Sequence, residues 1–211
     1  MKVQWENLQG ELSVPTAATG VVVFAHGSGS SRHSPRNRYV ADVLNEGGLA
    51  TLLIDLLNAE EQEVDPQTAQ LRFDIPFLAH RLVAITQWLR VQPQVDGLKV
   101  GYFGASTGAG AALVASAELP RLIHESVGAV VSRGGRPDLA GDALERVQAP
   151  TLAIVGGNDP VVLELNRQAL ARMNCVKALH VIPGAGHLFE EPGALEEVAK
   201  LARAWFTEEL S

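Results

Sequence analysis

The segment Gly104-Ala-Ser-Thr-Gly108 places one serine, Ser106, among small residues. It fits the pattern G-x-S-x-G, follows the apolar run 99–103 and precedes an alanine-rich stretch over 107–117. A reactive serine on a sharp strand-to-helix turn needs small neighbours on both sides, because the backbone there is strained and closely packed. An ordinary serine that caps a helix fits the same residues. The pattern therefore nominates Ser106 as a nucleophile without deciding the question.

A serine hydroxyl is a weak nucleophile at neutral pH, so it needs an adjacent base that is itself oriented by an acid. His187 is the candidate base, in the Gly/Pro-rich loop 183–188, and Asp159 is the candidate acid, in the turn Gly156-Gly-Asn-Asp-Pro160. Each has an ordinary alternative, since Asp159 also suits a helix N-cap and His187 a surface loop. Asp138 is a competing acid, although Arg136-Pro-Asp is typical of a helix start.

Backbone amides must stabilise the oxyanion that forms when a serine attacks an acyl carbon. Two are predicted to do so. One is the amide of Thr107, at the start of the helix that follows Ser106. The other is the amide of Ser28 in His26-Gly-Ser-Gly-Ser-Ser31, where flanking glycines allow a close approach of the backbone.

Apolar runs that suit buried strands alternate with segments that suit helices. This alternation predicts a mostly parallel sheet with helices on both faces, in which catalytic groups gather at the carboxyl ends of the strands. Serine, aspartate and histidine then follow three different strands, in that chain order. The predicted strands cover 21–25, 50–55, 99–103, 127–131, 151–155 and 178–182, and the predicted helices cover 35–46, 73–91, 107–117, 160–173 and 192–210. Segments 3–5 and 11–14 are expected to form an antiparallel hairpin at one edge, and 58–70 an exposed loop.

With the His26-Gly27 turn, GASTG, GGNDP and GAGH in that order, the chain resembles the α/β-hydrolase superfamily, and most closely its small, lidless branch around dienelactone hydrolase. The resemblance covers nearly the whole chain. It implies a single domain over 1–211 with three layers and no large cap domain, and a metal-free hydrolase of esters or similar acyl compounds without a cofactor. The chain departs from dienelactone hydrolase at the elbow, where that enzyme carries a cysteine and this chain carries Ser106.

Positive charge gathers near the expected mouth of the site. Arg133 follows the strand beside the elbow strand, and Arg32 and His33 follow the HGSGS loop. A guanidinium there could bind a carboxylate or phosphate of the substrate. It could equally pair with a nearby acid such as Asp138. Arg133 is the best substrate-binding candidate, with Arg32 and His33 behind it.

Composition limits the classes of function. The chain has 211 residues and a net charge of -7, which disfavours nonspecific binding to nucleic acid or to an anionic membrane. We expect no membrane segment and no signal peptide in the first residues, and the single cysteine, Cys175, is consistent with a cytoplasmic protein. No metal-ligand spacing is apparent. His80, His124 and His180 fall in predicted helices or strands and are expected to be structural.

The sequence thus predicts a serine hydrolase acting on a small-molecule ester through Ser106, His187 and Asp159. Two alternatives stay open. One is other acyl chemistry on the same residues, such as acyl transfer, thioester hydrolysis or lactone opening. The other is a catalytically idle binding protein on a hydrolase-like fold.

Overall fold

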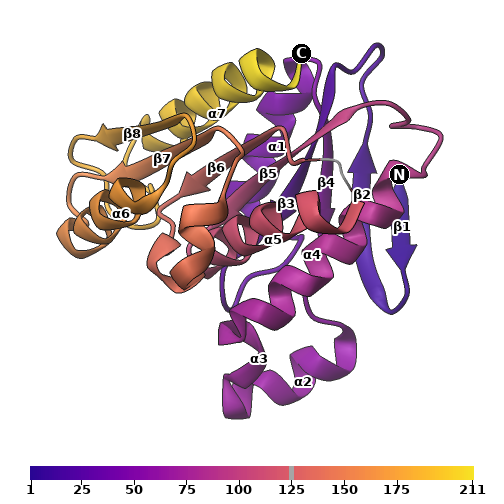
Figure 1. Cartoon of the computed structure of the whole chain (residues 1–211), viewed down its shortest axis with the longest axis horizontal. Coiled ribbons are helices and arrows are strands. Elements are labelled where there is room, and N and C mark those ends of the chain that lie inside the picture. The colour runs from indigo at the N-terminus through magenta and orange to yellow at the C-terminus, as the bar shows by residue number, and fades with distance from the viewer. Residues whose placement is uncertain (124–125) are drawn as a thin grey trace.

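The computed structural model describes residues 1–123 and 126–211. Within them the chain forms an eight-stranded sheet in the order β1-β2-β4-β3-β5-β6-β7-β8 (Figure 1). The strands are β1 (Lys2–Trp5), β2 (Leu8–Ser13), β3 (Gly20–Ala25), β4 (Ala50–Ile54), β5 (Lys99–Ala105), β6 (Ala129–Arg133), β7 (Thr151–Gly156) and β8 (Lys177–Ile182).

The sheet is parallel from β4 to β8 and antiparallel only at one edge, where β1 pairs with β2 and β2 with β4. Every residue of β3 and β4 is buried, which explains why these strands are largely apolar rather than alternating. The expected edge hairpin is present, with its second strand beginning earlier than predicted.

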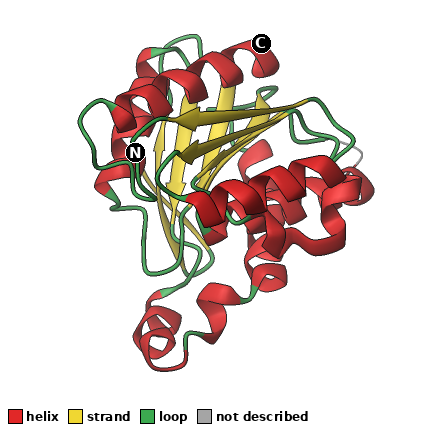
Figure 2. Ribbon diagram, turned by 90° about the vertical axis from the view of Figure 1, so that its left-hand side faces the viewer, coloured by secondary structure: helices red, strands yellow, loops and turns green. Residues whose placement is uncertain are grey.

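Helices cover both faces of the sheet, so the molecule has three layers (Figure 2). One face carries α1 (Pro35–Glu46) and α7 (Ala194–Leu210). The other carries α4 (Ile75–Arg90), α5 (Thr107–Ile123), α6 (Pro160–Arg172) and the 3-10 helix η1 (Pro137–Arg146). This is the predicted α/β-hydrolase architecture without a large cap domain.

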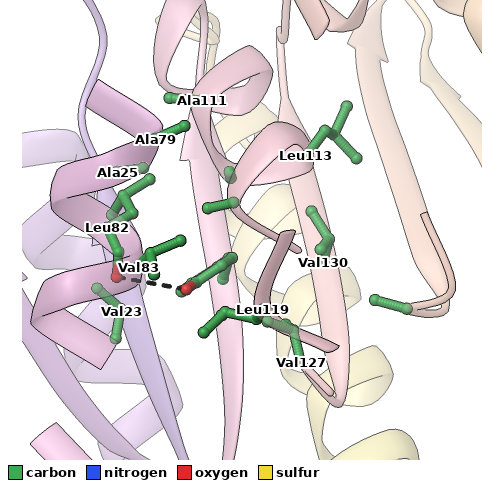
Figure 3. Packing of buried hydrophobic residues seen from close by; sticks show 14 of the residues in the cluster. Val23, Ala25, Ala79, Leu82, Val83, Ala111, Leu113, Leu119, Val127 and Val130 are labelled. Carbon is green, nitrogen blue, oxygen red and sulfur yellow. Dashed lines mark hydrogen bonds between the residues drawn. The ribbon is translucent and has the colours of Figure 1, made fainter. Parts of the chain in front are cut away.

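The larger core lies between the sheet and the α4–α5 layer (Figure 3). The apolar residues of α4 that recur every three or four positions are buried there, as their spacing predicts: Ile75, Leu78, Leu82, Ile85 and Leu89. Tyr102 of β5 is completely buried, and its hydroxyl lies 2.5 Å from that of Thr86 on α4. The core therefore fixes the strand that leads to Ser106.

The prediction of an exposed loop over 58–70 is wrong. This segment contributes to the helices α2 (Ala59–Thr68) and α3 (Gln70–Phe73), which project from the body of the molecule (Figure 1). The sequence of α2 has no stripe of apolar residues that would predict a helix, and Pro66 within it is typical of a helix break. Local polar contacts stabilise it instead. Asn58 and Glu61 form a capping box, and Asp65 pairs with Arg72 of α3 at 2.5 Å.

Two further differences from the prediction concern the 3-10 helix η1 and the length of α5. The helix start expected at Arg136-Pro-Asp is that of η1, for which no range was predicted and which bends at Gly141, where φ is +53°. The predicted helix over 107–117 continues to Ile123 as α5. His124, expected in a helix or strand, lies outside the described residues.

Candidate active site

Ser106 occupies a sharp turn between β5 and α5, the two elements that the sequence predicts around it. Its φ is +49°, in the left-handed region that residues other than glycine rarely adopt. The surrounding bonds hold it there: its N–H donates to the Arg133 carbonyl at 3.3 Å, and its carbonyl accepts the N–H of Arg136 at 3.0 Å. A strained, half-buried serine at a strand-to-helix turn has the backbone geometry expected of a nucleophile elbow.

The glycines of the elbow are required by close packing. A Cβ at Gly104 would lie 2.5 Å from Ala109 Cα, and one at Gly108 would lie 2.1 Å from the Ala25 carbonyl oxygen. These contacts press the first turn of α5 against the ends of β5 and β3. The small residues that drew attention to the sequence are thus explained by sterics at two named positions.

Asp159 and His187 are joined directly. His187 Nδ1 lies 2.7 Å from Asp159 Oδ2, so the carboxylate can orient the imidazole and leave Nε2 free to act as a base. The other carboxylate oxygen of Asp159 accepts the N–H of Val162 at 3.4 Å and caps α6. Asp159 is therefore both a helix N-cap and the partner of His187, which the sequence presented as alternatives.

The loops that carry Asp159 and His187 are bonded to each other. Asn158 donates its N–H to the Ala185 carbonyl at 2.9 Å and its side-chain amide to the Gly184 carbonyl at 2.8 Å. Glu191 accepts the N–H of Gly186, next to His187, at 2.9 Å. These bonds fix the spacing of the acid and the base independently of their own contact.

Contacts at Gly134 and Arg133 place His187 beside the turn that carries Ser106. A Cβ at Gly134 would sit 3.6 Å from His187 Cε1, and the preceding residue, Arg133, accepts the Ser106 N–H. No hydrogen bond joins Ser106 Oγ to His187 within the described part of the chain. Such bonds commonly tighten only when substrate is bound. The structure thus brings all three residues to one edge of the sheet, as predicted from their places after β5, β7 and β8.

The two expected oxyanion donors meet at the elbow. Thr107 is the first residue of α5, where a backbone N–H has no acceptor within the helix. The Ser28 N–H donates to Thr107 Oγ1 at 2.9 Å. A Cβ at Gly27 would lie 3.1 Å from Ser106 Cβ, so this loop rests against the nucleophile. In this structure the Ser28 N–H is therefore occupied by the Thr107 side chain, which the sequence did not single out.

His26 orders this loop from beneath. Its Nε2 accepts the Leu56 N–H at 3.0 Å, and Nδ1 lies 3.1 Å from the Gly27 carbonyl oxygen. The first bond requires a neutral Nε2, and the second then assigns the ring proton to Nδ1. Burial lowers the pKa of His26 below its usual value, against the opposing effects of the Gly27 contact and Asp55. His26 is therefore a structural residue that ties β3 to β4.

A pocket of about 320 Å³ opens beside the oxyanion loop. Its lining joins that loop and Thr107 to the projecting helices, with residues His26–Ser31, Leu56, Leu57, Gln62, Asp65, Pro66, Arg72, Leu78 and Thr107. Ser106 is adjacent to this lining rather than part of it. The α2–α3 arm thus forms one wall of the pocket, a role hidden from the sequence because the arm was predicted to be a loop.

Most of the candidate cations near the site are paired. Arg32 forms an ion pair with Asp55, and its own N–H donates to the same carboxylate at 2.7 Å. Arg136 forms a bidentate ion pair with Asp138, with both contacts at 2.8 Å. Asp138 is therefore paired with Arg136 and not with His187. His33 is exposed and lies 3.2 Å from Arg38. These contacts favour the structural interpretation for Arg32 and Arg136.

Arg133 differs from the others. Only 7% of it is exposed, and its guanidinium lies 5.9 Å from the centre of the Phe189 ring. No carboxylate pairs with it among residues 1–123 and 126–211. Burial, together with the nearby Arg36, lowers its pKa to about 10, so the side chain stays charged at neutral pH.

Two features concern the described residues as a whole. Within them no helix is both long and apolar enough to cross a bilayer. They also contain no group of three or more His, Cys, Asp or Glu side chains placed to hold a metal ion.

Solved structures with similar folds include enzymes named for ester chemistry. A dienelactone hydrolase from Anabaena variabilis is 60% identical, with a TM-score of 0.94 over 100% of this chain and 97% of that one. Est1E from Butyrivibrio proteoclasticus shares 16% identity and a TM-score of 0.79 over 99% of this chain and 98% of its own, a likeness of fold alone.

Curated relatives and a family model complete the comparison. Proteins from two strains of Mycobacterium tuberculosis, provisionally named phosphoribosyl transferases, are 62% identical over 201 residues. The match covers 95% of this chain but 44% of theirs, so the chain spans less than half the length of these relatives. The model of the dienelactone hydrolase family matches residues 8–208. The chain therefore belongs to the dienelactone hydrolase family and has the fold of an α/β-hydrolase.

Proposed function

We propose that this protein is a serine hydrolase that cleaves small esters through Ser106, His187 and Asp159. The observation that carries the proposal is the 2.7 Å contact between Asp159 and His187 at the same sheet edge as a serine held at a φ of +49°. Family membership supports hydrolase chemistry in general. The proposal adds the residues and the type of bond.

In the proposed reaction, Ser106 Oγ attacks the acyl carbon while its proton passes to His187 Nε2. Asp159 accepts the Nδ1–H and stabilises the imidazolium. The oxyanion binds the Thr107 N–H and the Ser28 N–H, and for this step the Ser28 N–H must leave Thr107 Oγ1, its acceptor in the structure. His187 then protonates the leaving alcohol, and a water molecule, activated by the same base, releases the acid and restores Ser106.

The pocket beside the loop 26–31 supports a small substrate. Its volume of about 320 Å³ is at the lower end of the range for small-molecule sites. Leu56, Leu57 and Leu78 form an apolar part of the lining that suits a short acyl or alcohol chain, although most of the lining side chains are polar. The proposal also places the enzyme in the cytoplasm, where the half-buried thiol of Cys175 would stay reduced.

Phosphoribosyl transfer is not part of the proposal, because that name belongs to proteins of which this chain spans 44%. Acyl transfer, thioester hydrolysis and lactone opening would use the same acyl-enzyme and are outcomes of the substrate test. An idle binding protein would have the same fold without an activated serine.

The test is labelling with a fluorophosphonate probe together with hydrolysis of 4-nitrophenyl butyrate. We expect wild type to be labelled and active, and Ser106→Ala to lose labelling and at least a thousandfold in kcat. Matched panels of esters, thioesters and lactones then rank the substrates. Wild type that is folded but neither labelled nor active would refute the proposal, as would a Ser106→Ala variant that keeps half the rate.

A further inference from the structure

The Arg133 guanidinium is a buried cation without a counterion. Among the residues that the structure describes, its Nε atom has no hydrogen-bond partner, and Nη2 reaches only the Asn37 amide oxygen, at 3.5 Å. Burying a charge without a partner costs free energy. For the same reason, a protein is strongly destabilised when one partner of a buried ion pair is removed. The ring of Phe189, 5.9 Å away, offers a weak cation–π contact but no charge.

A second arginine makes the local charge more unfavourable. Arg36 lies close enough for its charge to lower the pKa of Arg133, and its own Nε is buried without a partner. Its only carboxylate contact in the described chain is with Glu190, which is exposed, at 3.3 Å. Of the two guanidinium groups, only that of Arg36 therefore has a carboxylate partner among the described residues, and that acid is exposed.

The two arginines also meet the positive end of a helix. Arg36 and Asn37 lie in the first turn of α1, a 12-residue helix capped by Ser34. That turn contains no acidic residue. A helix N-terminus attracts anions and disfavours cations. Because Arg133 reaches Asn37 in this turn and Arg36 belongs to it, the helix end and the two arginines form a positive site that an anion would neutralise.

This site adjoins the proposed nucleophile. The Arg133 carbonyl accepts the Ser106 N–H, and Phe189 lies two residues beyond His187. A Cβ at Gly134 would lie 3.3 Å from Phe189 and 3.6 Å from the His187 ring, so one small surface links the guanidinium to the base.

We propose that Arg133, with Arg36 and the first turn of α1, binds an anionic group of the substrate, a carboxylate or a phosphate, while Ser106 attacks the ester. The inference rests on the proposed function for its catalytic part. It assigns Arg133 to substrate binding. Arg32 and Arg136 keep structural roles in their ion pairs with Asp55 and Asp138.

The experiment compares three 4-nitrophenyl esters at fixed ionic strength: the neutral butyrate, the anionic hemisuccinate and the anionic 3-phosphonopropionate. We expect wild type to prefer one anionic ester, and the anionic arms to distinguish carboxylate from phosphate. Arg133→Met should lower kcat/KM for the preferred anionic ester, relative to butyrate, roughly tenfold to a hundredfold. Arg36→Met, on a less buried side chain, should give a smaller change in the same direction.

Arg38→Met is the matched control, because Arg38 lies on the same helix but pairs with Glu11 at 2.8 Å. It should leave the ratio unchanged. An unchanged ratio in both Arg133→Met and Arg36→Met would overturn the proposal, as would an equal loss in Arg38→Met. If Arg133→Met does not fold, Arg36→Met decides between these results.

A binding arm separates this proposal from the catalytic one. In the Ser106→Ala background, succinate and inorganic phosphate serve as probes in thermal shift and calorimetric titration. We expect at least one to bind, and binding to be lost in Ser106→Ala/Arg133→Met but kept in Ser106→Ala/Arg38→Met. Wild type without esterase activity would refute the proposed function while these titrations still test the anion site. No binding of either probe would refute the anion site alone.

Discussion

Asp159 performs two tasks with two oxygen atoms, and substitution can separate them. Oδ2 contacts His187 Nδ1 at 2.7 Å, and Oδ1 caps α6 through the Val162 N–H at 3.4 Å. Asn caps a helix about as well as Asp, but its amide would donate to Nδ1 and force the ring proton onto Nε2. Asp159→Asn should therefore keep stability while losing roughly a thousandfold to ten-thousandfold in kcat.

Asp159→Ala removes both tasks. Loss of a cap typically costs about 1 kcal/mol, and the 3.4 Å bond places this one no higher than that. For a chain of this size we expect Tm to fall by about 2–4 °C in Asp159→Ala and to change much less in Asp159→Asn. Rates of 4-nitrophenyl butyrate hydrolysis and thermal melts measure the two effects. Asp138→Asn, on the rival acid bound to Arg136, is the control. Asp159→Asn with more than a tenth of wild-type kcat would refute the assignment.

Two other predictions follow from the oxyanion loop. Thr107→Val keeps the side-chain shape but removes the acceptor that holds the Ser28 N–H beside the elbow, so kcat should fall tenfold or more. Thr107→Ser should stay near wild type. A faster Thr107→Val would mean that the hydroxyl competes with the oxyanion for the Ser28 N–H. Because burial lowers the pKa of His26, the unfolded chain takes up a proton first as pH falls through about 6.5, and the free energy of unfolding should drop by up to about 1.4 kcal/mol per pH unit. Urea titrations should show this slope diminished in His26→Asn and kept in His80→Gln, on an exposed histidine; equal slopes in all three would contradict the role of His26.

The proximity of the three residues of the proposed triad was predictable because each lies just after a strand. Parallel strands bring their carboxyl ends to one edge, so chain order and glycine-rich turns were enough to place Ser106, Asp159 and His187 together. The backbone angle of Ser106 and the double bonding of Asp159 were beyond the sequence. Both depend on how β6 and β8 approach the elbow, which is tertiary geometry.

The α2–α3 arm shows where periodicity fails. Its stability comes from a capping box and from ion pairs to Arg72 and Arg81 rather than from an apolar stripe. Patterns of hydrophobic residues therefore carry little information about it. One wall of the pocket was missed for the same reason.

The sequence ranked Arg133 first among the arginines near the site by its place after a strand, and the structure distinguishes them by their partners. Asp55 lies 23 residues from Arg32 and Glu11 lies 27 from Arg38, so only the folded sheet shows that both are neutralised. Arg133 has no such partner within the described chain. What sets it apart is a missing acid, and that can be recognised only after the neighbours are known.

The overall charge and the local charge act in opposite directions on an anionic substrate. The chain carries a net charge of -7, so its distant field disfavours the approach of anions, although salt screens such a field beyond about 8–10 Å. At Arg133 and Arg36 the charge is positive and partly shielded from water, where contact interactions are stronger. Preference for an anion must then arise from short-range contacts with these guanidinium groups rather than from steering. This is why burial and lack of a partner, more than the number of arginines near the mouth, identify Arg133 as the residue that we propose selects the substrate.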